Sequence, residues 1–590
     1  MNKTAYSLFI LGGLVLTGCT LPQMINLAKQ QNLTVTPNPL EVHKDSVAYE
    51  MSSALPVKML KPGSIYTLNS FYKAGDKEVA LDPVNFKADE FPQAATQQPK
   101  LTRKFNFPYD ASLKSGVLQV EGVATKSGKS KSTPRMDIAT GVITTSKLVQ
   151  PSYFAAYADH GYNNQEEIIP VVIPNFLFEQ GRSVLNKKQI AGETGKQLDA
   201  FIATKNLTRT VTITGTHSPE GRERVNSKLS EERAAAIEKF YRDEMKKYDY
   251  QGMADGIKFI LKPVVDDWNE FKNALSSYTG IADDEKAKYV SIINSGGTFP
   301  DVEKQLSNLS SYKKVYKDIY PALRAAKTEI FTVKKKKTDP EISVLAKQIT
   351  SGQAGNDALS FEELMYAATL TPSLEEKAAI YSAATKYGNN WNAHNNLAAA
   401  YLSMGLENPA SLRDNAAKAA AQLEIAARLR STAQVSANLA TVALIQGSPW
   451  KAAAFATKAL SGAGNEVTRG VNGVKASSEI QMAKYAAAVS SASSATGSYV
   501  NLFNKGLAQL LNKDYANAAS SFAEASRANA GFGLAYYGAA VAAARQGNAD
   551  AVVSNLSKAV KADPNLKDAA LTDLEFAKWA ASDAFRSALK

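Results

Sequence analysis

The chain has 590 residues, enough for about three or four domains of ordinary size. Its 68 lysines and arginines outnumber 56 aspartates and glutamates, and the net charge of +12 suits a solvated basic surface near anionic lipid or cell wall better than a nucleic-acid site. The single cysteine, Cys19, excludes an internal disulfide, so hydrophobic packing has to stabilise every domain.

Residues 1–18 have the pattern of an export signal. Lys3 supplies a positive start, and the apolar run from Leu8 to Leu16 is shorter than the roughly 20 residues that span a bilayer. The segment alone would fit a generic secretory signal or a small membrane anchor. It ends, however, in Leu-Thr-Gly-Cys at residues 16–19, which resembles the lipobox of bacterial lipoproteins. The resemblance implies cleavage before Cys19 and diacylglycerol on its thiol.

The residues after Cys19 bear on the destination of the protein. Thr20 stands where an aspartate would resemble an inner-membrane retention signal, which favours the outer membrane. Residues 20–30 lack the acidic cluster that resembles a surface-export signal in Bacteroidetes lipoproteins, which favours the periplasmic face. We therefore predict a tether over residues 19–31 and a membrane contact through lipid alone, since two or more acyl chains hold a protein durably.

Residues 32–165 are predicted to form a β-rich domain. Turn-forming Pro, Gly and Asn residues separate short runs of strand composition, for example 64–68, 77–81 and 116–120. An immunoglobulin-like sandwich is the natural expectation. Gly128-Lys129-Ser130 resembles the end of a phosphate-binding loop, but Val123 occupies the position of its first glycine, so we predict a simple loop there.

Residues 168–337 alternate strand and helix patterns. Strands are predicted at 171–178 and 210–215, and amphipathic helices at 192–204 and 229–248. The stretches Gly-Thr-His-Ser-Pro-Glu-Gly at 215–221 and Asn-Ser-Lys-Leu-Ser-Glu-Glu-Arg-Ala-Ala-Ala-Ile at 226–237 resemble the OmpA-like peptidoglycan-binding domain in a Bacteroidetes variant, and Leu-Arg-Ala-Ala-Lys-Thr-Glu-Ile at 323–330 resembles its last strand. The resemblance covers the whole region, with a helical insertion at about 265–320.

The resemblance implies a binding site for the diaminopimelate of wall peptides. Arg233 matches the arginine that binds its carboxylate, and Asn226 matches the asparagine that orders the loop. Ser218 stands at the acidic position that binds the ammonium, and Glu220 is the nearest carboxylate able to replace it. The alternative is a structural one, in which Arg233 makes only a salt bridge on the helix surface with a residue such as Glu232 or Glu238.

Residues 338–353 are predicted to be a linker, and residues 354–590 a helical, Ala-rich region with a repeat of 34 residues. Gly506 aligns with Ala540 and Phe522 with Leu556 in that register, which resembles tetratricopeptide repeats. Two looser units around Ala398 and Ala440 are 440 − 398 = 42 residues apart, so an insertion is expected between them. A plain Ala-rich helical bundle is the alternative.

These predictions combine into a multidomain α+β fold class: a sandwich-like N-terminal region, an OmpA-like α/β domain and a C-terminal α-solenoid. They favour an outer-membrane lipoprotein that ties the envelope to peptidoglycan and offers the concave face of its repeats to a protein partner. The alternative is a scaffold subunit of an envelope secretion, motility or fimbrial machine with little wall binding. No cofactor, metal site or enzyme activity is predicted, because the four histidines lack metal-ligand spacing: His43, His160, His217 and His394.

Overall fold

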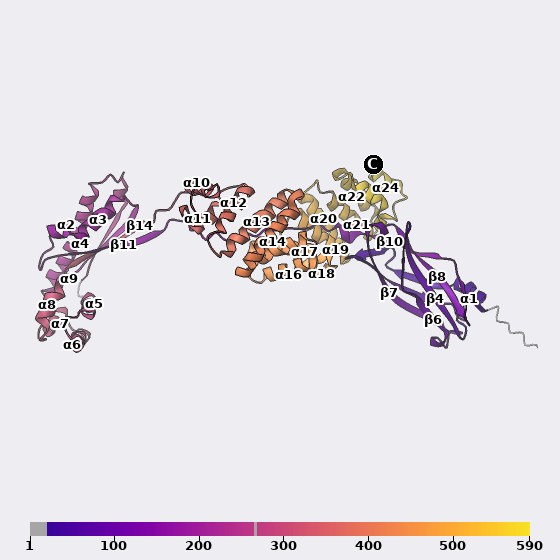
Figure 1. Cartoon of the computed structure of the whole chain (residues 1–590), viewed down its shortest axis with the longest axis horizontal. Coiled ribbons are helices and arrows are strands. Elements are labelled where there is room, and N and C mark those ends of the chain that lie inside the picture. Colours follow the sequence, from indigo (N-terminus) through magenta and orange to yellow (C-terminus); the bar gives the residue numbers. More distant parts are fainter. Residues whose placement is uncertain (1–19, 265–267) are drawn as a thin grey trace, which may run out of the picture. The chain divides into compact units, whose positions relative to one another are not determined.

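The computed structural model describes residues 20–264 and 268–590, so the predicted signal and Cys19 lie outside the described residues. The chain divides into two compact units. Unit 1 combines the chain up to Tyr162 with Asp339–Lys590, and unit 2 is Asn163–Thr338. The predicted fold class is confirmed: mixed β-sheets near the N-terminus, a second small mixed sheet with helices, and a C-terminal helical repeat region (Figure 1).

The N-terminal part of unit 1 is a β-domain, and several of its strands alternate between buried and exposed residues. The strands connect in the order β1-β3-β2-β10-β8-β4-β5, with β6, β7 and β9 paired to β4, β3 and β8. Along β4 every second side chain is buried, as expected for a strand with one face on a core. The strands are β1 (Asn32–Thr36), β2 (Leu40–His43), β3 (Ser46–Ala54), β4 (Ser64–Ala74), β5 (Lys77–Ala80), β6 (Val84–Lys87), β7 (Lys100–Pro108), β8 (Gly116–Lys126), β9 (Lys129–Ser132) and β10 (Met136–Ile143).

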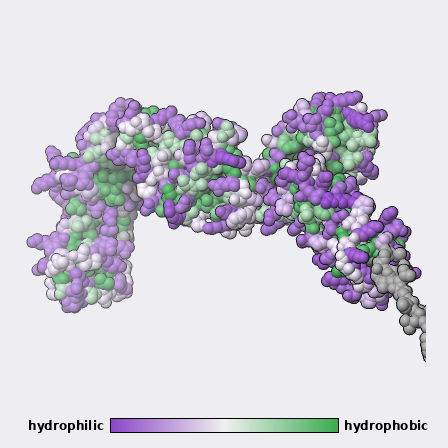
Figure 2. All heavy atoms as spheres, turned by 45° about the vertical axis from the view of Figure 1, so that its right-hand side comes forward, coloured by the Kyte–Doolittle hydropathy of each residue, from purple (hydrophilic) through white to green (hydrophobic). Residues whose placement is uncertain are grey.

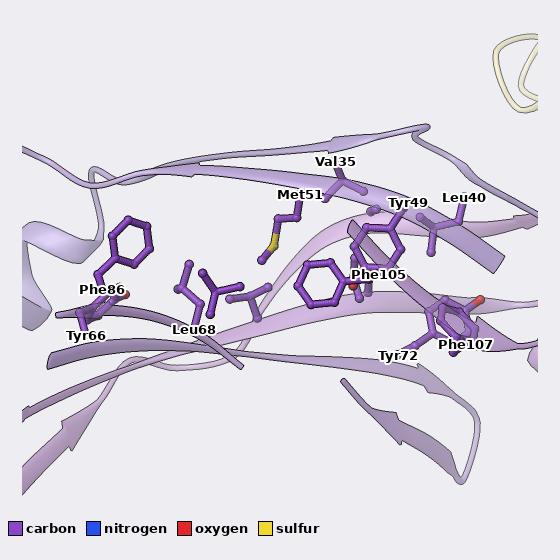
Figure 3. Close-up of a cluster of buried hydrophobic side chains, with 14 of the residues drawn as sticks. Val35, Leu40, Tyr49, Met51, Tyr66, Leu68, Tyr72, Phe86, Phe105 and Phe107 are labelled. Carbon is purple, nitrogen blue, oxygen red and sulfur yellow. The ribbon is translucent and has the colours of Figure 1, made fainter. Parts of the chain in front are cut away.

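Two layers of strands enclose the core of this domain. Val35 and Met51 come from one layer and Leu68 from the other, and their side chains meet in the interior (Figure 3). Residues 19–31, expected to be a plain tether, instead contain helix α1 (Thr20–Ala28). Met24 is fully buried and packs on the same core, because apolar residues recur along one side of this helix.

Unit 2 has a four-stranded sheet in the order β11-β14-β12-β13, in which only β12 and β13 run parallel. Ile237 of α4 and Leu198 of α3 bury their side chains against the sheet. The helical insertion, predicted at 265–320, consists of α5 to α9. The elements are β11 (Ile168–Leu177), α2 (Lys187–Ala191), α3 (Glu193–Ala203), β12 (Thr208–Gly215), α4 (Glu223–Met245), β13 (Lys258–Pro263), α5 (Asn269–Ser277), α6 (Asp283–Asn294), α7 (Phe299–Leu306), α8 (Tyr312–Asp318), α9 (Tyr320–Leu323) and β14 (Ala325–Val333).

The C-terminal part of unit 1 is a row of antiparallel helix pairs. Helices α19 and α21 start 533 − 499 = 34 residues apart, as do α20 and α22, which is the spacing of tetratricopeptide repeats. The helices are α11 (Phe361–Ala367), α12 (Leu374–Ala384), α13 (Trp391–Glu407), α14 (Leu412–Leu429), α15 (Ala433–Ile445), α16 (Pro449–Leu460), α17 (Asn465–Gln481), α18 (Tyr485–Ser493), α19 (Tyr499–Leu511), α20 (Tyr515–Ala528), α21 (Gly533–Arg545), α22 (Ala549–Ala562), α23 (Leu566–Thr572) and α24 (Asp583–Ala588).

Small residues let neighbouring repeat helices approach closely. A Cβ atom on Gly506 would lie 2.8 Å from the Phe522 ring, and one on Gly538 would lie 2.6 Å from it. The spacing of 42 residues near the start of the repeats has a different cause from the expected insertion. Helices α13 and α14 have 17 and 18 residues, whereas α19 and α20, which follow the 34-residue register, have 13 and 14, so the longer helices account for the whole excess.

The predicted linker at 338–353 is wrong in its main part. Helix α10 (Asp339–Thr350) occupies it, and Ile342, Ala346 and Ile349 are buried against the first repeat helices. Their spacing of four and three residues is that of an apolar helix face. Within the described residues, no helix combines the length and apolarity needed to cross a bilayer. The face drawn in Figure 2 is largely hydrophilic, with scattered hydrophobic residues.

The predicted end of the β-domain at residue 165 also needs correction. After β10 the chain leaves the β-domain, and residues 150–158, which we call the strap, run across the first helices of successive repeat pairs. In Figure 1 this purple trace follows the repeat helices toward α11. The repeats, whose concave face was expected to bind a protein partner, therefore hold a segment of the same chain across the first helices of their pairs.

Candidate functional site

The loop between β12 and α4 lies where a strand and a helix cross closely. A Cβ atom on Gly215, the last residue of β12, would lie 1.9 Å from the carbonyl oxygen of Ser230 in α4, so only glycine permits this crossing. Gly221 has a φ of +107°, a conformation that side chains disfavour, and it turns the loop toward α4. These two glycines place residues 216–220 beside the first turns of the helix.

Asn226 holds the loop in this position. Its Nδ2 atom donates to the carbonyl oxygen of Glu220 at 3.1 Å and, more weakly, to that of Ser218 at 3.5 Å. The residue is buried, with 5% of its surface exposed. The geometry is that expected of an asparagine that orders a loop, because a buried amide has to find acceptors.

Ser218 and Glu220 share one partner that the sequence analysis did not assign to the site. Arg324 lies just before β14, and its Nε donates to Ser218 Oγ at 2.9 Å while its Nη2 donates to Glu220 Oε1 at 2.7 Å. Both Ser218 and Arg324 are buried. The signal was present in the sequence: an arginine between two apolar residues, Leu323 at the end of α9 and Ala325 at the start of β14, needs a buried partner for its charge.

Arg233 is almost fully buried, with 1% of its surface exposed, and it contacts backbone rather than carboxylates. Its guanidinium donates to the carbonyl oxygens of Thr216 at 2.7 Å, Arg182 at 3.1 Å and Glu179 at 3.5 Å. Burial and, to a lesser extent, the nearby charge of Arg324 together lower the pKa of Arg233 to about 10.

The expected alternative, a surface salt bridge of Arg233, is wrong. Glu232 contacts Ser183 and Lys228, and Glu238 accepts a hydrogen bond from Arg242. The reason is that Arg233 points inward from α4, under the loop, whereas these glutamates lie on the outer side of the helix. The structure therefore brings the four predicted residues into one region: three at the loop, and Arg233 beneath it.

The helical insertion contributes a second missed residue. Glu303 of α7 is buried and accepts hydrogen bonds from the hydroxyl groups of Tyr312 and Tyr320. Burial, helped by the nearby charge of Glu220 and opposed by the two tyrosine hydrogen bonds, raises the pKa of Glu303 to about 7. No motif marked this glutamate, because it lies far along the chain in the insertion and only the fold brings it near the loop.

The cluster has the chemistry to hold a zwitterion. Among the described residues, the Oε2 atom of Glu220 is buried and has no hydrogen-bond partner. A carboxylate oxygen in this state is an acceptor for an ammonium group. Arg233 and Arg324 bring two positive charges, and guanidinium groups are the preferred partners of a ligand carboxylate.

No family model and no curated protein matches the sequence. Solved structures similar to this chain include the C-terminal part of a TPR repeat-containing protein from Cytophaga hutchinsonii, at 15% identity and a TM-score of 0.29, over 39% of this chain and 92% of that chain. PilF of Pseudomonas aeruginosa is similar at 19% identity and a TM-score of 0.27, over 33% and 90%. YrrB, described as a TPR protein with an unusual peptide-binding site, is similar at 18% identity and a TM-score of 0.22, over 40% and 99%. The repeat character of this chain follows from its own helix spacing.

Proposed function

We propose that this chain is a lipid-anchored adaptor of the bacterial envelope. Lipid on Cys19 holds it in the outer membrane, on the periplasmic face, and unit 2 binds peptidoglycan through the zwitterionic end of wall peptides. The repeat region serves as a scaffold for an envelope protein. The strand and helix order of unit 2, β11-α3-β12-α4-β13-β14, supports the resemblance to the OmpA-like domain.

One observation carries the wall-binding part of the proposal. Glu220 Oε2 is buried without a partner, and the other oxygen of the same carboxylate is held by Arg324. Glu220 therefore takes the role that an aspartate at position 218 would have in the family: it accepts the ammonium of the ligand. Arg233 and Arg324 supply the positive field for the ligand carboxylate, and Ser218 positions Arg324.

Retention of the purified chain on peptidoglycan tests this assignment. Glu220→Gln keeps the shape of the side chain but removes its charge, so retention falls by roughly tenfold to a hundredfold, the value of a hydrogen bond to a charged group. Glu231→Gln, on the exposed side of α4, is the matched control and keeps full retention. Free diaminopimelate releases the bound protein. Failure of the unmodified chain to bind, or equal retention of both variants, would refute wall binding.

The second candidate function is a scaffold subunit of an envelope machine with little wall binding. The geometry of Arg233 favours it, because three of its N–H groups already donate to backbone carbonyls of the same unit. In that case unit 2 is a docking module for proteins. Crosslinking of intact cells followed by mass spectrometry separates the two functions: the scaffold requires a protein crosslinked to both unit 2 and the repeats, and crosslinks to wall material alone would count against it.

A further inference from the structure

The strap is held by a ladder of five polar side chains, which come from the first helices of four successive helix pairs. Ala156 donates its N–H to Asn438 Oδ1 at 2.7 Å, and its carbonyl accepts from Asn438 Nδ2 at 2.8 Å. Asn396 holds both backbone groups of Ala158 in the same way, at 2.6 and 2.9 Å. Thr441 forms hydrogen bonds with both backbone groups of Phe154, and Asn504 does so with those of Gln150. Ser477 accepts a hydrogen bond from the N–H of Ser152.

The ladder follows from the repeat itself. Asn396, Asn438 and Asn504 are each the sixth residue of their helix, since 396 − 391 = 438 − 433 = 504 − 499 = 5. Successive contacts fall on every second strap residue, as expected for an extended chain that turns alternate residues to the same side. The groove therefore recognises the backbone of an extended peptide: it binds both the N–H and the C=O of Gln150, Phe154, Ala156 and Ala158, and the N–H of Ser152.

The groove is also shaped for the side chains of this segment. A Cβ atom on Gly470 of α17 would lie 2.3 Å from the Phe154 ring, and one on Gly473 would lie 2.6 Å from Ser152 Oγ. Gly470 occupies the sixth position of its helix, where the three other helices carry asparagine. Two helix glycines cost stability, and here they provide the room that the strap needs.

We propose that the groove of the repeats is an extended-peptide clamp that the chain occupies with its own strap, so that it is closed to peptides of other proteins. A protein partner of unit 1 then binds outside this groove. The proposal is independent of wall binding by unit 2, because every contact that carries it lies within unit 1.

Amide hydrogen exchange of the full chain tests the ladder without any variant. The amides of Phe154, Ala156 and Ala158 donate to groove side chains, whereas no partner is found for those of Ala155 and Tyr157 in the described structure. The first three amides exchange at least tenfold more slowly than the other two, although the strap belongs to no helix or strand. Equal, fast exchange at all five positions would overturn the proposal.

A labelled peptide with the sequence of residues 149–160 tests occupancy. The unmodified chain does not bind it, because the strap fills the groove. The strap variant Ala156→Pro with Ala158→Pro lacks two of the donated N–H groups, so its groove opens and the peptide binds at least tenfold more tightly. Ala155→Pro is the matched control, since the N–H it removes has no partner, and it behaves like the unmodified chain. Tight binding of the peptide to the unmodified chain would show an open groove and refute closure.

Discussion

Replacing Arg233 with alanine is expected to destabilise unit 2 rather than only weaken ligand binding. The guanidinium makes two well-formed hydrogen bonds, to the carbonyls of Thr216 at 2.7 Å and Arg182 at 3.1 Å, and a third contact at the limit of hydrogen bonding. Each buried carbonyl left without a donor costs about 1–3 kcal/mol. Loss of the repulsion between Arg233 and Arg324 offsets part of this, so we expect a net loss of about 3 kcal/mol.

Hydrogen exchange of the full chain measures this loss within unit 2. The slowest amides of β12 exchange through opening of the whole unit, so a loss of about 3 kcal/mol accelerates them roughly a hundredfold. Lys228→Ala is the matched control on the same helix, since the lysine side chain is 76% exposed, and it leaves the rates within about twofold. Unchanged β12 exchange in Arg233→Ala would refute the view that this arginine supports the loop from below.

The expected destabilisation also decides which variant tests ligand binding. If Arg233→Ala lost retention on peptidoglycan, the cause could be the loss of stability rather than of a ligand contact, so Glu220→Gln is the better variant for that test.

Three further changes have defined outcomes. The pKa of Glu303 is raised to about 7 in the folded state, so folded unit 2 binds more protons than the unfolded chain between about pH 4.5 and 7. Its unfolding free energy therefore falls as the pH rises through that window. In a pH series of urea unfolding, Glu303→Gln removes this fall and flattens the profile. Arg545→Ala leaves the carboxylate of Glu575, whose side chain is 3% exposed, without its ion pair, and lowers the unfolding free energy of unit 1 by about 3–5 kcal/mol in urea titrations. Gly470→Ala pushes the Phe154 ring out of the groove and increases chymotrypsin cleavage of the strap severalfold.

Matched controls separate each effect from general damage. Glu329→Gln, exposed on β14, leaves the pH profile unchanged. Arg428→Ala removes an ion pair whose two side chains are at least 70% exposed and costs less than about 1 kcal/mol. Gly464→Ala has no atom within 4 Å of the added Cβ and keeps the strap protected. The stated cause would be contradicted for Glu303 if the pH profile of Glu303→Gln still fell. It would be contradicted for Arg545 if Arg545→Ala were as stable as its control, and for Gly470 if Gly470→Ala were cleaved no faster than its control.

The elements that the sequence predicted well are those in which one local pattern decides the structure. The strand composition of residues 64–68, set between turn-forming residues, correctly predicted a part of β4. The 34-residue register of Gly506 and Phe522 correctly predicted repeat helices, because small and large residues meet at their crossings. Residues 338–353 were misjudged as a linker because four lysines and one proline, Pro340, precede the apolar face that begins at Ile342.

The strap was missed for the opposite reason. Residues 150–158 have no helical or strand period of their own, and their partners lie on four different helices. The clue lay in the sequence of the repeat helices rather than in that of the strap. Three of these helices carry asparagine at equivalent positions, for example Asn396 and Asn438, where a helix face packed in a core would be apolar. A residue such as Glu303 left no such clue, because neither its spacing nor its neighbours distinguish it from a surface glutamate.

The strap also sets an order of events during synthesis. Gln150 is made long before its partner Asn504, 354 residues later. At the usual rate of about 5–20 residues per second, roughly 20 to 70 seconds pass before the last rung of the ladder exists. The Phe154 ring likewise has no groove to enter until Thr441 and Gly470 have been made. The finished molecule thus requires this segment to stay extended and unassociated until the repeat helices that hold it have been made.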